Sequence, residues 1–123
     1  MGDESICAQT KQSRHTFNYE RLKTISNGKA IKSVWRDIWK MSSVDHSEKV
    51  FGKHPTQKPE GVIKRAILVS SNTGDVVFDP FYGSGTTGVV CKKQNRKFVG
   101  IDNNIEYLNI AKKRLASASN RNN

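Results

Sequence analysis

Residues 79–87 read Asp-Pro-Phe-Tyr-Gly-Ser-Gly-Thr-Thr and directly follow the apolar run Val-Val-Phe at residues 76–78. A β-branched run that breaks at glycines and resumes as Val-Val at residues 89–90 is typical of a strand that leads through a tight turn into a helix. Because glycine has no Cβ, the backbone at Gly83 and Gly85 can approach a bound molecule closely, and unpaired amides at the helix start face the same place. The stretch therefore predicts a strand, a ligand-binding turn and a helix.

A second apolar segment, residues 97–101, leads into Asp102. In doubly wound α/β folds, an acidic residue at the tip of the second strand, about 20 residues past the glycines, accepts hydrogen bonds from a ribose. The order of strand, glycine turn, helix, strand and acid predicts an α/β protein with a partial Rossmann-like fold and a nucleotide-type cofactor. The turn matches neither Gly-x-Gly-x-x-Gly nor the phosphate loop ending in Gly-Lys-Ser/Thr, which argues against a dinucleotide and against ATP.

Further segments around the turn form a pattern with it: residues 54–59 (His-Pro-Thr-Gln-Lys-Pro), residues 98–102 (Phe-Val-Gly-Ile-Asp), Tyr107, Ala111 and Arg114. Together with residues 79–87, and in this order, they resemble the C-terminal part of the bacterial DNA amino-methyltransferases of type II restriction-modification systems. The close resemblance covers residues 34–115, and residues 17–32 are similar to the family more loosely. Enzymes of this family transfer a methyl group from S-adenosylmethionine to the exocyclic amine of adenine or cytosine.

The resemblance implies S-adenosylmethionine as the cofactor and a partial Rossmann-like methyltransferase fold. Asp79 and the turn of residues 83–85 are expected to hold the methionine end of the cofactor, and Asp102 the ribose hydroxyls. Thr86 and Thr87 are expected to cap the helix behind the turn.

The segment of residues 54–59 is expected to lie against the same pocket. Its polar side chains would contact the cofactor, and Pro59 suits the first turn of a helix. For His54, structural packing as a hydrogen-bond bridge in a loop is the alternative. The complete set of cofactor-binding residues that the resemblance implies is His54, Thr56, Gln57, Lys58, Asp79, Pro80, Phe81, Gly83, Ser84, Gly85, Thr86, Thr87 and Asp102.

The tetrad that carries out catalysis in this family is absent from the sequence. It consists of Asp, Asn or Ser followed by Pro-Pro and an aromatic residue, and it grips the target base once that base has left the duplex. The stretch of residues 79–82 lacks the second proline and belongs to the glycine turn. We therefore predict no catalytic residue in this chain.

The expected strands, residues 75–78 and 97–101, are too few for a stable parallel sheet, which is normally buried on both faces. We therefore predict that the chain is the C-terminal portion of a longer enzyme, from a frameshifted gene, a split subunit or a truncated product. It would work with the missing N-terminal half or with a partner chain.

The net charge of +10 and the pI near 9.9 favour double-stranded DNA as a partner. Basic residues gather at residues 92–97 and 112–114. Each group is either a DNA contact or a solvated helix end whose cations complement the helix dipole. By resemblance, adenine is preferred over cytosine as the target.

Four segments are expected along the chain: a flexible tail at residues 1–16, a remnant of a target-recognition region at 17–50, the cofactor-binding subdomain at 51–115 and a disordered tail at 116–123.

Cys7 and Cys91 lie far apart, the histidines have no metal-binding spacing, and no apolar run reaches the length of a membrane span. We expect no disulfide, no metal, no membrane and a cytoplasmic location.

Two functions from different classes remain open. The first is a methyltransferase segment whose catalytic tetrad comes from elsewhere. The second is a noncatalytic module that binds DNA or the cofactor without turnover. A third function, methylation of RNA or of a small molecule on the same fold, is disfavoured because residues 54–59 and the glycine turn of residues 79–87 occur together.

Overall fold

The computed structural model describes residues 15–25, 27–28, 50–52 and 58–118. In chain order, the elements of this part are α1 (Tyr19–Ile25), α2 (Glu60–Ser70), β1 (Val76–Asp79), α3 (Thr86–Lys93), β2 (Lys97–Gly100) and α4 (Ile105–Ser117). The predicted α/β class and the predicted order of strand, turn, helix and strand are confirmed.

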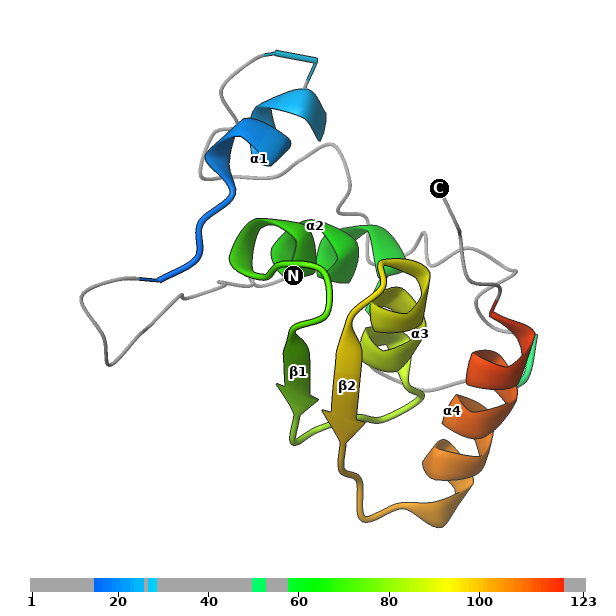
Figure 1. The fold of residues 1–123 in the computed structure, drawn as a ribbon. Helices are drawn as coiled ribbons and strands as arrows, with labels where there is room; N and C mark the ends of the chain where they lie inside the picture. The colour runs from blue at the N-terminus through cyan, green and yellow to red at the C-terminus, as the bar shows by residue number, and fades with distance from the viewer. Residues whose placement is uncertain (1–14, 26, 29–49, 53–57, 119–123) are drawn as a thin grey trace, which may run out of the picture.

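The two strands form a parallel sheet in which α3 makes the crossover (Figure 1). Val76 pairs with Lys97, and the register continues to Asp79 opposite Gly100. Each strand lies within one residue of its predicted position. Because parallel strands end at the same edge of a sheet, the turn after β1 and the residues after β2 are brought together there.

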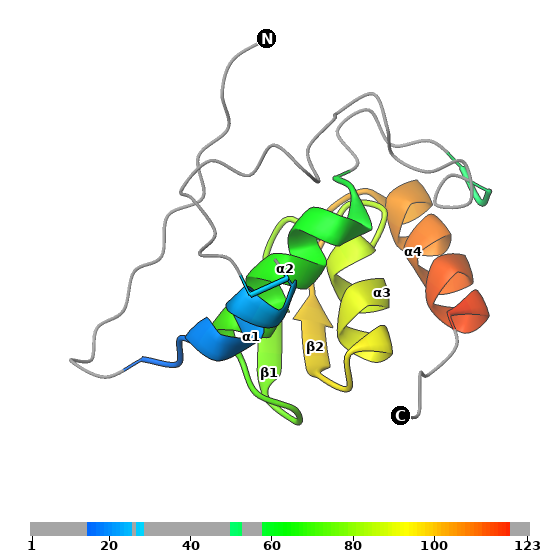
Figure 2. The same cartoon turned by 90° about the horizontal axis from the view of Figure 1, so that it is seen from above.

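Helices cover one face of this sheet. Ile67 of α2 and Val90 and Cys91 of α3 form the buried cluster, and Val77 and Phe98 from the strands pack against it. α1 lies against α2, and α4 lies against α3 (Figure 2). The core of the described residues therefore sits between the sheet and the α2–α3 pair.

The opposite face of the sheet is apolar and exposed to solvent. Val76 and Phe78 of β1 are 64% and 60% exposed, and Val99 and Ile101 are 50% and 55% exposed. Because residues in a strand alternate between the two faces, these side chains share the face that α2 and α3 do not cover. We call these four residues the open face.

The helix ends are fixed by local polar contacts. The Asn104 side chain accepts hydrogen bonds from the amides of Glu106 and Tyr107 and so caps the start of α4. At the end of α2, the Asn18 amide group donates to the carbonyl oxygens of Leu68 and Ser71, both at 2.9 Å. This contact ties α1 to α2 across a long stretch of chain.

Two segment boundaries differ from expectation. α4 continues to Ser117, two residues into the segment expected to be a disordered tail, because its last turn makes regular helical hydrogen bonds that include Ala118 N to Arg114 O at 3.0 Å. Pro59 is the N-cap of α2 with extended backbone, so the helix begins at Glu60. Residues 1–14 and most of residues 17–50 lie outside the described residues, as do residues 119–123.

Candidate cofactor-binding site

Asp79 ends β1 and organises the turn that follows. One of its carboxylate oxygens accepts a hydrogen bond from the hydroxyl of Thr87 at 2.6 Å, and the other accepts from the amide of Phe81 at 3.0 Å. The carboxylate thus ties the end of the strand to the first turn of α3. Asp79 therefore belongs to the glycine turn, as the sequence predicted.

Asp102 reaches the same turn from the end of β2. Its Oδ2 accepts a hydrogen bond from the amide of Gly83 at 2.8 Å, and its Oδ1 accepts from the amide of Asn104 at 2.8 Å. Each carboxylate oxygen has two lone pairs and can accept from more than one donor. The carboxylate and the glycine turn are in direct contact.

The backbone of the turn takes conformations that favour glycine. Gly83 has φ of 52° and Gly85 has φ of 82°, both in the left-handed region. A Cβ on Gly85 would lie 2.6 Å from Cβ of Ala111 on α4. For Gly85, the close approach that requires glycine is therefore to α4, a reason that the sequence alone does not reveal.

Tyr82 fills the space beneath the turn. It is buried and its ring stacks on Phe98, with ring centroids 6.0 Å apart. A Cβ on Gly88 would lie 2.0 Å from the Tyr82 hydroxyl, and one on Gly100 would lie 2.5 Å from its ring. Within the described residues the hydroxyl has no hydrogen-bond partner, and burial raises the pKa of Tyr82 to about 12.

Arg114 of α4 holds the turn from behind, and the sequence did not single out this role. Its Nη1 donates to the carbonyl oxygen of Ser84 at 3.0 Å, to the Ser84 hydroxyl at 3.1 Å and to the Thr86 hydroxyl at 3.0 Å. Its Nη2 forms an ion pair with Glu60 of α2 at 3.4 Å. Arg114 and Ala111, one helical turn apart, belong to the pattern shared with the family, but that pattern assigns no role to Arg114.

The expectation that Thr86 and Thr87 cap α3 is wrong. The N-cap of α3 is Gly85, which has no side chain to accept from the helix amides. The two threonine hydroxyls instead bond to Arg114 and to Asp79.

The structure brings together a compact subset of the predicted site: Asp79, Gly83, Ser84, Gly85, Thr86, Thr87 and Asp102. Pro80 and Phe81 are exposed beside them, and the Phe81 side chain is 88% exposed. Lys58 is half-buried next to the N-cap of α2. His54, Thr56 and Gln57 lie outside the described residues, so their predicted contacts remain predictions.

Two arginines of the basic groups are not on the surface. Arg114 and Arg96 are each 5% exposed, and Arg96 donates to the hydroxyl and the carbonyl oxygen of Ser71. Burial lowers the pKa of Arg96, with a further contribution from Arg21. These two arginines therefore have structural roles in the fold. The prediction that they are DNA contacts or solvated helix ends, like the neighbouring lysines, is wrong for them.

The lysines beside them also have structural contacts. Lys92 Nζ donates to the carbonyl oxygen of Leu115 at 2.9 Å, and Lys93 Nζ pairs with Glu60 at 2.6 Å.

In the part of the chain that the structure describes, no group of His, Cys, Asp and Glu side chains is arranged to hold a metal ion. None of the helices found there has the length and apolar character needed to cross a bilayer.

The site suits a ligand that carries hydroxyl or amino donors. Two carboxylates lie at the carboxyl edge of a parallel sheet, which is where open α/β sheets bind ligands. An exposed aromatic side chain, Phe81, stands beside them. These features define the class: an α/β nucleoside-binding unit with an acidic, glycine-containing turn.

Comparison with known proteins gives the family. The model of the N6 and N4 methyltransferase family, described as DNA methylase, matches residues 2–113. The chain belongs to this DNA methylase family.

Individual relatives agree with this assignment. The Type II methyltransferase M2.LlaDCHI of Lactococcus lactis subsp. cremoris is 55% identical over 105 residues, which make up 85% of this chain and 38% of the relative. M2.DpnII of Streptococcus pneumoniae is 49% identical over 112 residues, which make up 91% of this chain and 40% of the relative. The crystal structure of an M1.HpyAVI–SAM complex matches with a TM-score of 0.63 and 37% identity, covering 85% of this chain and 46% of that one. The chain thus spans less than half the length of these relatives.

Proposed function

We propose that this chain is the S-adenosylmethionine-binding C-terminal portion of a Type II DNA methyltransferase that methylates the exocyclic amine of adenine in double-stranded DNA. The observation that carries the proposal is the hydrogen bond from the Gly83 amide to the Asp102 carboxylate at 2.8 Å. It joins the glycine turn after β1 to the acidic tip after β2. Cytosine is the less favoured target, and we place the protein in the cytoplasm, where bacterial DNA lies.

The residues of the site have different roles in binding the cofactor. Asp102 offers lone pairs to the ribose hydroxyls, and Asp79 holds the turn so that its backbone faces the methionine end of the ligand. Phe81, exposed beside the turn, offers an apolar surface that a bound ligand would cover. Lys58, with the predicted contacts of His54, Thr56 and Gln57, would close the pocket from the segment before α2.

S-adenosylmethionine supplies an electrophilic methyl group on a sulfonium. The contribution of this chain is to fix where that group lies, because effective transfer depends on placing the reacting atoms in line and close together. Gripping the flipped base needs polar and apolar groups of the Pro-Pro tetrad, which the sequence lacks. We therefore propose that turnover requires the portion of a methyltransferase that lies outside the segment matched in these relatives.

The open face is where that portion would dock. Val76, Phe78, Val99 and Ile101 leave one side of a parallel sheet exposed to water, although such sheets are normally covered on both faces. The relatives are more than twice as long as the matched segment, so they have enough additional chain to cover this face. An apolar helix face from that additional chain is the occupant we propose.

Two measurements test the proposed function. Calorimetry should show saturable binding of S-adenosylmethionine to this chain. Transfer of a radiolabelled methyl group to DNA should be absent for the chain alone and should appear when the non-matching portion of M2.LlaDCHI is supplied as a separate chain. Activity of the isolated chain would contradict the requirement for a second portion.

A matched pair of variants tests the docking surface. Phe78→Asp places a charge on the open face and should abolish association with the supplied portion, and with it the activity, while leaving cofactor binding intact. Ile25→Asp, which changes a 38% exposed apolar residue on α1, should leave that association unchanged. Equal effects of the two variants would show that the open face is not the docking surface.

A noncatalytic module remains the second candidate, because the catalytic tetrad is absent and the sheet has one uncovered face. It predicts binding of DNA or cofactor with no methyl transfer under either condition. The complementation experiment separates the two candidates directly.

A further inference from the structure

We infer that Arg114 positions the cofactor turn and that Ser84 and Thr86 act through it, with Glu60 linking this arrangement to the segment before α2. The inference rests on the proposed function for its ligand. It changes the expected role of Ser84, which was predicted to hold the methionine end of the cofactor, and of Thr86, which was predicted to cap the helix and was counted among the cofactor-binding residues.

The burial and direction of these side chains carry the first step. Ser84 is 4% exposed and Thr86 is 7% exposed, and both hydroxyls bond to Nη1 of Arg114 at 3.0 to 3.1 Å. A hydroxyl that is buried against a guanidinium is already engaged on the inner side of the turn. The outer side is therefore left to the backbone of the turn and to the carboxylates.

Arg114 also fixes one peptide plane of the turn. The carbonyl oxygen of Ser84 accepts from Arg114 at 3.0 Å, and the amide of Gly85, in the same peptide unit, donates to the carbonyl oxygen of Tyr82 at 3.0 Å. The two groups of a trans peptide point in opposite directions. Held from both sides, this plane cannot rotate, and the ψ angle of Ser84 and the φ angle of Gly85 on either side of it are fixed.

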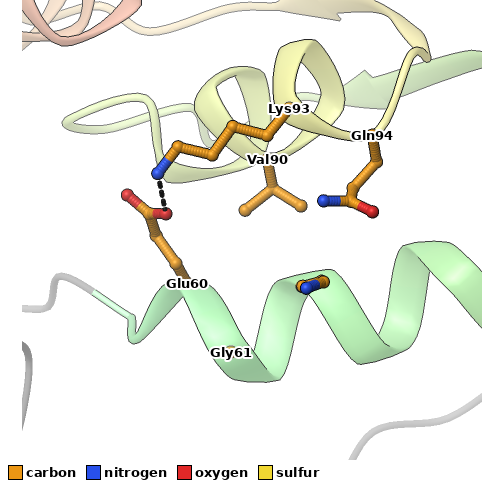
Figure 3. A pocket seen from close by; sticks show the side chains of 6 residues that line it. Glu60, Gly61, Val90, Lys93 and Gln94 are labelled. Carbon is orange, nitrogen blue, oxygen red and sulfur yellow. Dashed lines mark hydrogen bonds and ion pairs between the residues drawn. The ribbon is translucent and has the colours of Figure 1, made fainter. Parts of the chain in front are cut away.

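Glu60 supplies the charge that a buried guanidinium needs. Its carboxylate pairs with Arg114 at 3.4 Å and with Lys93 at 2.6 Å, and Figure 3 shows it reaching from α2 toward Lys93 on α3. A buried charge without a partner is costly, so this carboxylate stabilises the arrangement. Because Glu60 directly follows Pro59, the N-cap of α2, the same ion pairs connect the start of α2 to the turn.

The neighbouring Lys113 provides the matched control. It lies on the same helix, carries the same charge and is exposed. Arg114→Met should weaken S-adenosylmethionine binding by about 10-fold or more, since a charged hydrogen bond to the turn is worth roughly that much, while Lys113→Met should change it less than about twofold. Arg114→Lys keeps the charge but loses the fork geometry, so it should recover only part of the affinity.

Affinities are measured on folded protein, well below the unfolding temperature of each variant. A purely structural Arg114 would lower that temperature and leave the affinity of the folded protein unchanged. If Arg114→Met does not fold, Ser84→Ala and Thr86→Val carry the test, because each removes one acceptor and keeps the volume nearly constant.

A double-mutant cycle distinguishes positioning from direct contact. If Ser84 acts through Arg114, adding Ser84→Ala to Arg114→Lys should cost less affinity than Ser84→Ala costs alone. Equal costs in both backgrounds would mean that Ser84 touches the ligand itself, and the inference would then be wrong.

A second readout separates this inference from the proposed function. In the ligand-free protein, amide hydrogen exchange at Gly85 should accelerate by about 10-fold or more in Arg114→Met, because one of the two anchors of its peptide plane is lost. Exchange in β1 and β2 should not change, and neither should exchange at Gly85 in Lys113→Met. A wild-type chain that fails to bind S-adenosylmethionine overturns the proposed function, whereas unchanged exchange at Gly85 overturns the role of Arg114.

Discussion

The two faces of the β1–β2 sheet differ sharply. On one face, Val77 and Phe98 pack against Ile67, Val90 and Cys91, and above them the glycine turn is held in place by α4. On the other, large apolar side chains from both strands are at least half exposed. The covered face and α4 hold the turn, whereas the described residues leave the open face without packing partners. Under the proposed function, this difference would make cofactor binding separable from catalysis.

Replacing one valine by aspartate on each face of the sheet should give the largest difference in unfolding free energy. Val90 is 2% exposed and Val76 is 64% exposed. Val90→Asp buries an uncompensated charge and should cost about 4 kcal/mol or more of unfolding free energy. Val76→Asp lies in water and should change it by less than about 0.5 kcal/mol. Urea denaturation followed by circular dichroism measures both, and similar losses would show that the open face is packed in solution.

The contact between the turn and α4 is tested by a pair of glycines. Gly85 and Gly74 both have left-handed backbones, with φ of 82° and 88°, but only Gly85 has a neighbour where a Cβ would be placed. Gly74→Ala should cost about 1–2 kcal/mol from backbone strain alone. Gly85→Ala should cost about 2–4 kcal/mol, because the clash with Ala111 adds to that strain. Equal losses in denaturation experiments would remove α4 as the support of the turn.

The ligand side of the turn should respond through Asp102. Asp102→Ala removes the acceptor for the ribose and for the Gly83 amide, so S-adenosylmethionine binding should weaken by about 1–3 kcal/mol. Glu106→Gln, at an exposed acidic position in the first turn of α4, is the control and should bind like the wild type. Calorimetry on both folded variants makes the comparison, and unchanged affinity in Asp102→Ala would remove this residue from the site.

A substitution at Tyr82 should give the smallest effect, and it should stabilise the protein where the other substitutions weaken stability or binding. Its buried hydroxyl has no partner within the described residues, so Tyr82→Phe should raise the unfolding free energy by about 1 kcal/mol near neutral pH. The cofactor affinity should stay the same, since the ring and its stacking on Phe98 are retained. A loss of stability would indicate that the hydroxyl is hydrogen-bonded.

The pH dependence of stability follows from the same burial. Tyrosine in an unfolded chain ionises near pH 10, whereas burial raises the pKa of Tyr82 to about 12. Between these values unfolding releases a proton, so the stability of the wild type should fall as the pH rises. The stability of the Tyr82→Phe variant should fall less steeply above pH 10. Burial also raises the pKa of Cys91 from 9.0 to about 11, so part of the decline should remain in the variant.

Much of the framework was accessible from the sequence because its signals are local. The β-branched runs placed β1 and β2 within one residue, and the glycines placed the turn between β1 and α3. The contact of Asp102 with Gly83 followed from the geometry of parallel strands, whose ends lie at the same edge.

What the sequence did not reveal depends on pairs that are distant in the chain. Arg114 and Ser84 are 30 positions apart, and Arg96 and Ser71 are 25 apart. A basic residue in a run of lysines looks like surface, and only the packing of α4 on α3 shows that Arg114 is buried. The role of the threonines after Gly85 was misjudged for the same reason, because their hydroxyls bond to tertiary partners and not to the helix end.

The most direct test of the account is a titration of the isotope-labelled chain with S-adenosylmethionine, followed by the backbone amide signals. The account predicts saturable binding in which the amide of Gly83, hydrogen-bonded to Asp102 in the structure, is among the most strongly shifted signals. Saturable binding whose shifts avoid the turn between β1 and α3, or no binding at any concentration tested, would contradict it.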